Sequence, residues 1–176
     1  VQDSPALRPL VEAIINVGTE KKPQLLTVFA VHWKSKTGSG NNASIRDAQE
    51  RQLIQKIRSQ QTHNPHTPFI ICGDFNQQLE EFTQLHTLAV CWNNADYLLR
   101  KEEGSQPDGS YYFQNRWEKI DHIFYDTGSA AIIPTSFFVL YEPPLVQDGK
   151  PVRYNTLSGE GYSDHLPLGF RFKMPD

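Results

Sequence analysis

Four short polar segments of this chain carry the residue types that metal-assisted cleavage of a phosphate ester requires, namely carboxylates, imidazoles and a side-chain amide. The segments are His32-Trp33-Lys34-Ser35, Gly73-Asp74-Phe75-Asn76, Ile120-Asp121-His122 and Ser163-Asp164-His165. Each one borders or begins a run typical of a β-strand, so side chains far apart in sequence can meet at one edge of a sheet. We therefore expect one site assembled from all four segments.

Asp74 and Asn76 follow the short apolar run Phe69–Cys72. Gly73, which separates the run from Asp74, allows the backbone to turn sharply and present both side chains above the sheet edge. Carboxylate and amide oxygens suit Mg²⁺ or Mn²⁺, and an amide NH₂ can bind a phosphate oxygen without adding negative charge. The alternative is an ordinary turn, because Gly, Asp and Asn all favour turns.

Asp164 and His165 are neighbours at the start of the last predicted strand, where adjacent side chains point in opposite directions. A metal ligand and a general base can therefore share this segment without pairing with each other. A histidine base needs a separate carboxylate that fixes its tautomer and stabilises the imidazolium. We predict that Asp121 is this partner, because an unpaired Asp within the apolar run Ile120–Phe124 would be costly. The alternative is that Asp121 makes a structural hydrogen bond to the backbone.

His32 follows the predicted strand Leu25–Val31 and is close in sequence to Lys34 and Lys36. The two lysines form a local cationic patch on an otherwise acidic chain, and we expect a substrate phosphate to bind there. A lone histidine at the end of a strand is often structural, so the alternative is that His32 only hydrogen-bonds its own loop.

The composition fits a single globular domain, since 176 residues that are 38% hydrophobic can bury a sizeable core. A net charge of −3 and a pI near 6.1 exclude a protein that binds nucleic acid mainly through a basic surface, for which the pI is usually above about 9. No run approaches the roughly 18 apolar residues of a membrane span. The two cysteines do not make a disulfide framework, so they leave the cellular compartment open.

The first half of the chain alternates strands and helices, and the second half is mainly β. In the first half we predict strands at Leu10–Val17, Leu25–Val31 and Phe69–Cys72, and helices at Ser44–Gln60 and Glu80–Leu88. In the second half we predict strands at Tyr111–Phe113, Trp117–Tyr125, Ile133–Tyr141 and Leu166–Phe172. Between the last two strands, Glu142–Gly161 is rich in Pro, Gly and polar residues, which is typical of a long loop.

Taken together, the four motifs resemble those of the endonuclease/exonuclease/phosphatase superfamily, whose members include pancreatic deoxyribonuclease and apurinic endonucleases. Two stretches, from Arg8-Pro9 to Lys36 and from Tyr111 to His122, are particularly similar to bacterial members. The resemblance implies an α/β (α+β) fold, a four-layer sandwich of two packed, mainly antiparallel β-sheets flanked by helices. We also expect a bacterial, soluble protein, with secretion or a periplasmic location left open.

The resemblance implies a role for each residue of the motifs. His165 would be the general base that activates water, Asp121 its orienting partner, and Asp164 a metal ligand. Asp74 and Asn76 would bind the phosphate and a metal or the nucleophilic water.

In the same resemblance His32 matches a second histidine that acts near the leaving group. The superfamily also has an early Asn and a metal-binding Glu, and neither motif is found upstream of His32. We therefore expect residues 1–176 to be a single domain that forms the C-terminal part of a longer catalytic domain. The upstream part would belong to the same protein, with a separate chain as the alternative, and the isolated fragment would be inactive.

The predicted function is divalent-metal-dependent hydrolysis of phosphodiester bonds by an endonuclease or exonuclease. Mg²⁺ is the expected ion, with Mn²⁺ or Ca²⁺ as alternatives, and nucleic acid is the expected partner. A phosphatase or phospholipase acting on inositol phosphates or sphingomyelin is the first alternative, because an acidic chain suits small or lipid substrates better than long duplex DNA. The second alternative is a non-catalytic binding module. The complete motif set argues against it, since a degenerate copy has no chemical reason to keep the Asp and His residues of the motifs.

Overall fold

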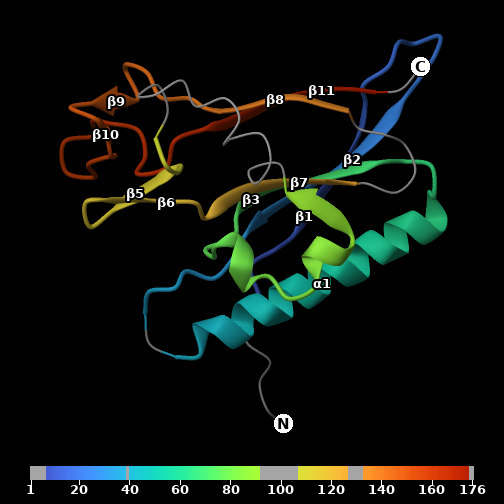
Figure 1. Cartoon of the computed structure of the whole chain (residues 1–176), viewed down its shortest axis with the longest axis horizontal. Coiled ribbons are helices and arrows are strands. Elements are labelled where there is room, and N and C mark those ends of the chain that lie inside the picture. The colour runs from blue at the N-terminus through green and yellow to red at the C-terminus, as the bar shows by residue number, and fades with distance from the viewer. Residues whose placement is uncertain (1–6, 39, 92–106, 127–132, 175–176) are drawn as a thin grey trace.

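The computed structural model describes residues 7–38, 40–91, 107–126 and 133–174 (Figure 1). Its helices are α1 (Asn42–His63) and two short 3₁₀ helices, η1 (Leu79–Glu81) and η2 (Leu85–Thr87). Its strands are β1 (Val11–Asn16), β2 (Leu25–His32), β3 (Phe69–Asp74), β4 (Ala89–Cys91), β5 (Tyr111–Phe113), β6 (Arg116–Glu118), β7 (Asp121–Asp126), β8 (Ile133–Val139), β9 (Val146–Gln147), β10 (Lys150–Pro151) and β11 (Leu168–Lys173).

The central sheet has five strands in the order β1-β2-β3-β7-β4. β2 and β3 run parallel, and α1 makes the crossover between them, as a parallel pair requires. The other neighbouring pairs of this sheet are antiparallel. The predicted mainly antiparallel pairing is therefore confirmed.

α1 covers one face of the central sheet (Figure 1). The helix begins where the side chain of Asn41 accepts a hydrogen bond of 3.1 Å from the backbone N–H of Ser44. Its apolar stripe of Leu53, Ile54 and Ile57 is buried against the aromatic side chains of the sheet. Among the described residues no helix is both long and apolar enough to cross a membrane.

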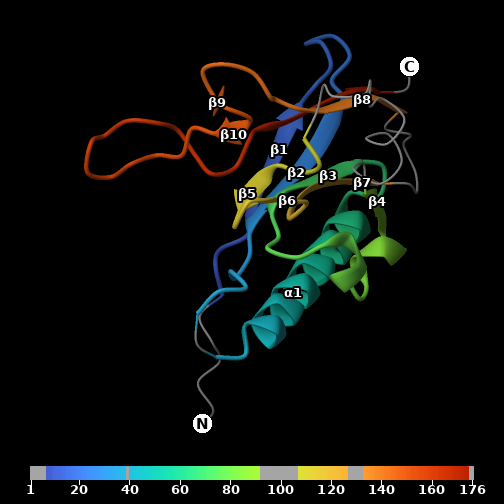
Figure 2. The same ribbon diagram turned by 60° about the vertical axis from the view of Figure 1, so that its left-hand side comes forward.

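A second, two-stranded sheet of β8 and β11 covers the opposite face (Figures 1 and 2). Phe137 and Val139 of β8 pack with Leu26, Ile70 and Ile123 of the central sheet in a second apolar cluster. Two packed sheets in a mixed α/β fold agree with the prediction. The described residues form three layers, α1, the central sheet and the β8–β11 sheet, so the predicted fourth layer is not among them.

The predicted helix Glu80–Leu88 is wrong, because this segment forms η1 and η2 instead. Glu50 of α1, only 1% exposed, accepts hydrogen bonds of 2.8 to 3.2 Å from the backbone N–H groups of Thr83, Gln84 and Leu85. These groups bond a buried carboxylate rather than the carbonyl groups of a preceding helical turn. The tertiary contact therefore replaces the helix that the apolar periodicity favoured.

Several predicted elements have different limits in the structure, and three of them bear on the site. Trp117–Tyr125 is divided at Lys119 and Ile120, because β6 pairs with β5 whereas β7 pairs with β3 and β4. The predicted loop Glu142–Gly161 contains the short β9–β10 pair. The last strand begins at Leu168, two residues later than predicted, so the motif histidine precedes it.

Candidate active site

The register of the central sheet brings three of the four motifs to one edge. β2 and β3 are parallel, and His32 is the register partner of Asp74 at their carboxyl ends. β7 runs antiparallel to β3, so Asp121 at the start of β7 is the register partner of Asp74. Residues far apart in the sequence therefore lie side by side.

Hydrogen bonds to the β5 strand deliver the fourth motif to the same edge. His165 forms an isolated antiparallel bridge with Tyr111. The backbone N–H of Leu166 donates to the carbonyl oxygen of Ser110 at 2.7 Å. The N–H of Tyr112 donates to the carbonyl oxygen of Asp164 at 3.2 Å. The segment before β11 is thus fixed to β5 and not only to its own strand.

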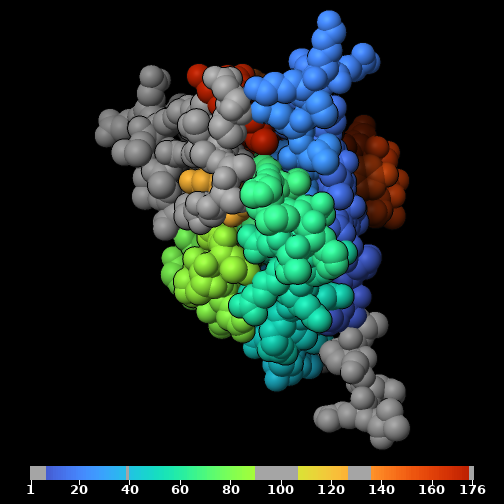
Figure 3. All heavy atoms as spheres, turned by 90° about the vertical axis from the view of Figure 1, so that its right-hand side faces the viewer, coloured from blue at the N-terminus to red at the C-terminus, as the bar shows by residue number. Residues whose placement is uncertain are grey.

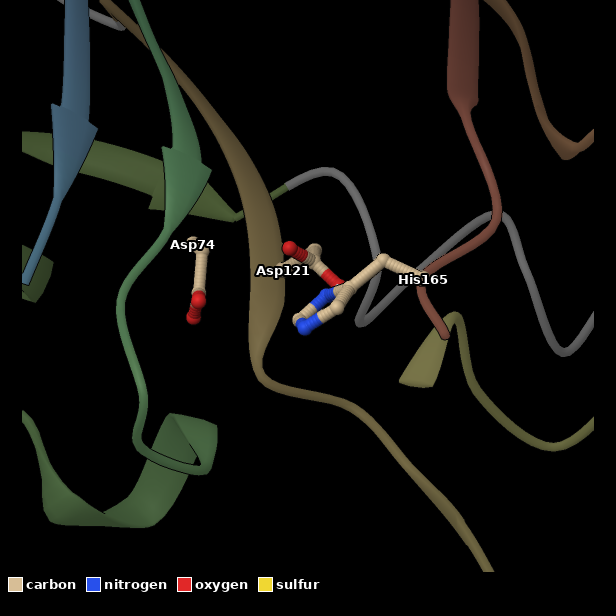
Figure 4. Close-up of side chains that lie close together, drawn as sticks. All are labelled: Asp74, Asp121 and His165. Carbon is tan, nitrogen blue, oxygen red and sulfur yellow. The ribbon is translucent and has the colours of Figure 1, made fainter. Parts of the chain in front are cut away.

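Asp121 and His165 form a close side-chain pair (Figure 4). His165 Nδ1 lies 2.8 Å from Asp121 Oδ2. The His165 side chain is 28% exposed and the Asp121 side chain is 13% exposed. Burial by itself would lower the pKa of His165, but the hydrogen bond and charge of Asp121 outweigh it, so the pKa lies above 6.5. An imidazole held this way at Nδ1 can accept a proton at Nε2.

Asp74 completes a group that could hold a metal ion. One ligand atom each of Asp74, Asp121 and His165 lies within 4.8 Å of the others. Burial, and next the charge of Asp121, raise the pKa of Asp74. Two partly buried carboxylates this close destabilise each other's charge, and a divalent cation would relieve that repulsion. The oxygen-rich donor set therefore fits a hard cation.

Asn76 fixes the Asp74 carboxylate. Its side-chain Nδ2 donates to Asp74 Oδ2 at 2.9 Å and to the carbonyl oxygen of Trp33 at 3.1 Å, while its backbone N–H donates to Asp74 Oδ1 at 2.8 Å. Gly73 allows the close approach of β2 and β3, because a Cβ there would lie 2.0 Å from the carbonyl oxygen of Val31. Asn76 thus lies beside Asp74, as predicted, and its side-chain NH₂ is used within the protein.

The predicted cationic patch is the more open side of the site. His32 Nε2 lies 3.5 Å from Asp74 Oδ2, and the His32 side chain is 63% exposed. Lys36 Nζ forms an ion pair of 2.5 Å with Glu81. The backbone N–H of Lys34 donates to the side chain of Gln49 on α1 at 2.9 Å, which anchors the loop. Of these three residues, His32 is the one whose described contact reaches Asp74, whereas Lys34 and Lys36 contact Gln49 and Glu81 and the charge of Lys36 is partly neutralised.

The Asp164 side chain contacts Arg153 and is not a member of the group of Asp74, Asp121 and His165. Its Oδ2 is 3.4 Å from Arg153 Nη2, and the Arg153 side chain is 71% exposed. His165 points instead to Asp121, so the two neighbours have separate partners, as predicted, although both residues precede β11. Arg153 lies in the segment between β10 and β11 that the sequence marked only as loop.

His122 is directed away from Asp121, because adjacent side chains of a strand point to opposite faces. It is 1% exposed, its ring packs against the rings of Phe75 and Phe124, and its Nε2 lies 2.9 Å from the carbonyl oxygen of Gln77. Burial lowers the pKa of His122, so the folded protein favours the neutral imidazole. We assign it to the core and not to the site.

Two residues in contact with the site were not singled out from the sequence as site residues. Ser110 Oγ donates to Asp121 Oδ2 at 2.6 Å, and the ring of Tyr111 stacks on that of His165. Tyr111 begins both the predicted strand Tyr111–Phe113 and the stretch that resembles bacterial family members, and Ser110 directly precedes it. Neither signal distinguishes a site residue from an ordinary strand residue.

The model of the Endonuclease/Exonuclease/phosphatase family matches residues 5–165, which include all four motifs. The chain belongs to this family. The family's description names endonucleases, exonucleases and phosphatases, and these are hydrolases. No curated protein matches the chain in a sequence search.

Solved structures share the fold at low sequence identity. The chain matches the human Nocturnin catalytic domain with bound sulfate anion at TM-score 0.57 and 19% identity, covering 94% of this chain and 52% of that one. A functionally unknown conserved protein from Enterococcus faecalis matches at TM-score 0.63 and 16% identity, with coverage of 99% and 59%. TDP2 from D. rerio complexed with single strand DNA product matches at TM-score 0.53 and 15% identity, with coverage of 95% and 68%.

These matches identify the DNase I-like fold, and they also give a length comparison. The chain spans 52% of the Nocturnin chain and 59% of the Enterococcus faecalis chain, so it corresponds to little more than half of either.

Proposed function

We propose that residues 1–176 are the C-terminal part of a divalent-metal-dependent phosphodiesterase that acts on nucleic acid as an endonuclease or exonuclease. The observation that carries the proposal is the Asp121–His165 pair, 2.8 Å apart, next to Asp74 in a group within 4.8 Å. A base held by one carboxylate beside a second carboxylate is the arrangement that hydrolysis of a phosphate ester by activated water needs.

His165 is the proposed general base. Its Nδ1–H donates to Asp121 Oδ2, which leaves Nε2 to take a proton from the attacking water. Asp121 fixes the tautomer and stabilises the imidazolium that forms. Their limited exposure reduces competition from solvent for this hydrogen bond.

Asp74 is the proposed main metal ligand of this chain, with Asn76 holding it in place and Asp164 as a further ligand. Mg²⁺ is the ion we expect, with Mn²⁺ or Ca²⁺ as alternatives, because the donors are oxygen atoms. When bound, a divalent ion stabilises the negative charge that develops on the phosphate. Asn76 remains a candidate ligand or phosphate contact through its side-chain oxygen.

His32, Lys34 and Lys36 form the proposed phosphate side. His32 lies across Asp74 from the base, where a cationic or proton-donating group assists departure of an alkoxide. The two lysines would hold flanking phosphates of a polymer, and Lys36 would exchange its ion pair with Glu81 for one of them.

The rest of the domain is proposed to precede this chain in the same protein. All six residues of β1 are exposed, and the strand lies on the face that Figure 3 shows. Val11, Ile14 and Ile15 are 57%, 55% and 41% exposed. An edge strand with this much apolar surface needs a cover. The upstream part would supply the cover and the carboxylate that completes the metal site.

A phosphatase or phospholipase is the competing candidate. It is favoured by the net charge of −3, since long duplex DNA is bound through many cationic contacts. Nucleic acid is favoured by the paired lysines near His32 and by the likeness to a TDP2 structure that contains a single strand DNA product.

The test is a substrate panel with the full-length protein. Plasmid DNA, RNA, sphingomyelin and inositol polyphosphates are each incubated with Mg²⁺, Mn²⁺ or a chelator, with His165→Ala as the control for contaminating activity. We expect metal-dependent cleavage of DNA or RNA that chelator and His165→Ala both abolish. Turnover of inositol phosphates or sphingomyelin while every nucleic acid stays intact would remove the nuclease assignment.

A further inference from the structure

We propose that Ser110 and Tyr111 are positioning residues of the site, which fix the Asp121–His165 pair through two different contacts. The inference rests on the proposed function for its effect on turnover, and on the described geometry for the contacts themselves. Neither residue was assigned a role by the motifs.

Ser110 holds the carboxylate of Asp121. Its hydroxyl donates to Asp121 Oδ2 at 2.6 Å, and His165 Nδ1 lies 2.8 Å from the same oxygen. The last torsion of an aspartate side chain is soft, so a single hydrogen bond leaves the carboxylate free to rotate. Two donors on one oxygen from different segments restrict that rotation and aim the oxygen at the imidazole.

The backbone of Ser110 is itself fixed on two sides. Its carbonyl oxygen accepts from the N–H of Leu166 at 2.7 Å, and its N–H donates to the carbonyl oxygen of Glu118 at 3.2 Å. Ser110 is 2% exposed, and a Cβ on its neighbour Gly109 would lie 2.3 Å from the oxygen of Glu118. The Ser110 hydroxyl is therefore held by the same backbone that carries the base.

Tyr111 holds the plane of the imidazole. Its ring lies 4.4 Å from the His165 ring, centroid to centroid, at an interplanar angle of 29°, and the two residues are also bridge partners in the backbone. On β5 the ring of Phe113 stacks on Tyr111 at 5.9 Å and 10°. A stacked aromatic surface resists tilting of the imidazole away from Asp121.

The two contacts restrict different motions, so turnover should depend on different properties of the side chains at Ser110 and Tyr111. The Ser110 contact depends on a hydroxyl and should survive replacement by Thr. The Tyr111 contact depends on an aromatic face and should survive replacement by Phe, which keeps the ring and removes only the phenol oxygen.

The first experiment is steady-state kinetics on the best substrate of the panel. Ser110→Ala should lower kcat by about tenfold to a hundredfold with KM changed little, because the variant lacks a hydrogen bond to a charged group while the phosphate side is intact. Ser110→Thr should recover most of the decrease. Ser136→Ala is the matched control, since Ser136 lies on β8 and its Oγ has no hydrogen-bond partner among the described residues. If Ser110→Ala does not fold, Ser110→Cys weakens the donor and keeps the shape.

Tyr111 is tested in the same assay. Tyr111→Phe should retain kcat within about twofold, whereas Tyr111→Leu should lower it by about tenfold at similar KM. A decrease in Tyr111→Phe equal to that in Tyr111→Leu would overturn the stacking role. Normal kcat in Ser110→Ala, or failure of Ser110→Thr to recover it, would overturn the role of the hydroxyl.

A spectroscopic measurement separates this inference from the proposed function. The His165 Nδ1–H should give a slowly exchanging, downfield proton resonance in the wild type and in Ser110→Thr, and a broadened or faster-exchanging one in Ser110→Ala. An unchanged resonance in Ser110→Ala would contradict the positioning role. If the wild type cleaves no phosphodiester, the proposed function fails, and this resonance alone decides the inference.

Discussion

The two sides of the site differ in how firmly the fold holds them. On the base side, Asp121 and His165 are mostly buried and are fixed by Ser110, by stacking on Tyr111 and by hydrogen bonds to β5. On the phosphate side, the His32 side chain is 63% exposed, and its Nε2 lies 3.5 Å from Asp74 Oδ2.

The difference follows from what each side has to do. A general base acts through the position of one nitrogen atom, and an error of about an ångström lowers the rate strongly. Lysines that hold phosphates act as mobile charges in solvent, where salt screens them and exact placement matters less. We therefore expect substitutions on the base side to change turnover, and those on the phosphate side to change binding.

The largest effect is expected for His165→Ala on the base side. In the full-length variant turnover should fall by at least the roughly hundredfold that a general base contributes. Steady-state kinetics on a phosphodiester measures it. His63→Ala is the matched control, because His63 is exposed at the end of α1. Near-normal turnover in His165→Ala would remove the mechanism.

The next effect concerns the metal, which lies between the two sides in our proposal. Residues 1–176 alone should bind Mg²⁺ weakly, because Asp74, Asn76 and Asp164 lack the upstream carboxylate that would complete the coordination shell. Isothermal titration calorimetry tests this, with Asp74→Asn as the variant that should remove the remaining heat. Tight, stoichiometric binding by residues 1–176 would contradict the incomplete site.

A third effect is the pH dependence of turnover. His165 must be neutral to accept a proton, and the hydrogen bond and charge of Asp121 raise its pKa despite burial. The rate should therefore rise with pH through a value above the ordinary histidine pKa of about 6.5. In Asp121→Asn this rise in the pH–rate profile should move to lower pH, and the maximum rate should fall. If the rate of Asp121→Asn rises at the same pH as that of the wild type, a group other than His165 controls the pH dependence.

A smaller effect is expected in the stability of the fold. A raised pKa of His165 in the folded state stabilises the protein below the unfolded value of about 6.5, and this contribution disappears as the pH rises through the folded pKa. His122, whose pKa is lowered by burial, has the opposite sign and destabilises the fold on acidification. Urea unfolding at about pH 7.5 and about pH 5.5 should therefore show a larger decrease in stability on acidification in His165→Gln than in the wild type. An equal decrease in both proteins would contradict the raised pKa.

The smallest effects are expected on the phosphate side. Lys34→Ala and Lys36→Ala should weaken nucleic-acid binding and flatten its salt dependence by about one unit of slope for each phosphate that is no longer bound. Removing the exposed Lys36–Glu81 pair should change stability by no more than about 1 kcal/mol. The test is the affinity for nucleic acid measured at several salt concentrations, with Lys21→Ala in the β1–β2 turn as the control. Reduced turnover with unchanged binding would reverse the assignment of the two sides.

The sequence by itself determined the parts of this protein that local pattern encodes. The apolar run at Phe69–Cys72 and the stripe of Leu53, Ile54 and Ile57 predicted β3 and α1. Burial of a strand on both faces gives a continuous apolar run, and burial of a helix on one face gives a periodic stripe. The four motifs likewise indicated the family, because their order and residue types are written along the chain.

Tertiary structure decided what depends on partners distant in sequence. Glu50 is 33 to 35 residues from the N–H groups that it binds, and it turned the predicted helix Glu80–Leu88 into two short 3₁₀ helices. Ser110 meets Asp121 and Arg153 meets Asp164 only because the β5 hairpin and the segment before β11 fold back to the sheet edge. Such contacts leave no period in the sequence, since each joins single side chains whose spacing is set by the packing of whole elements.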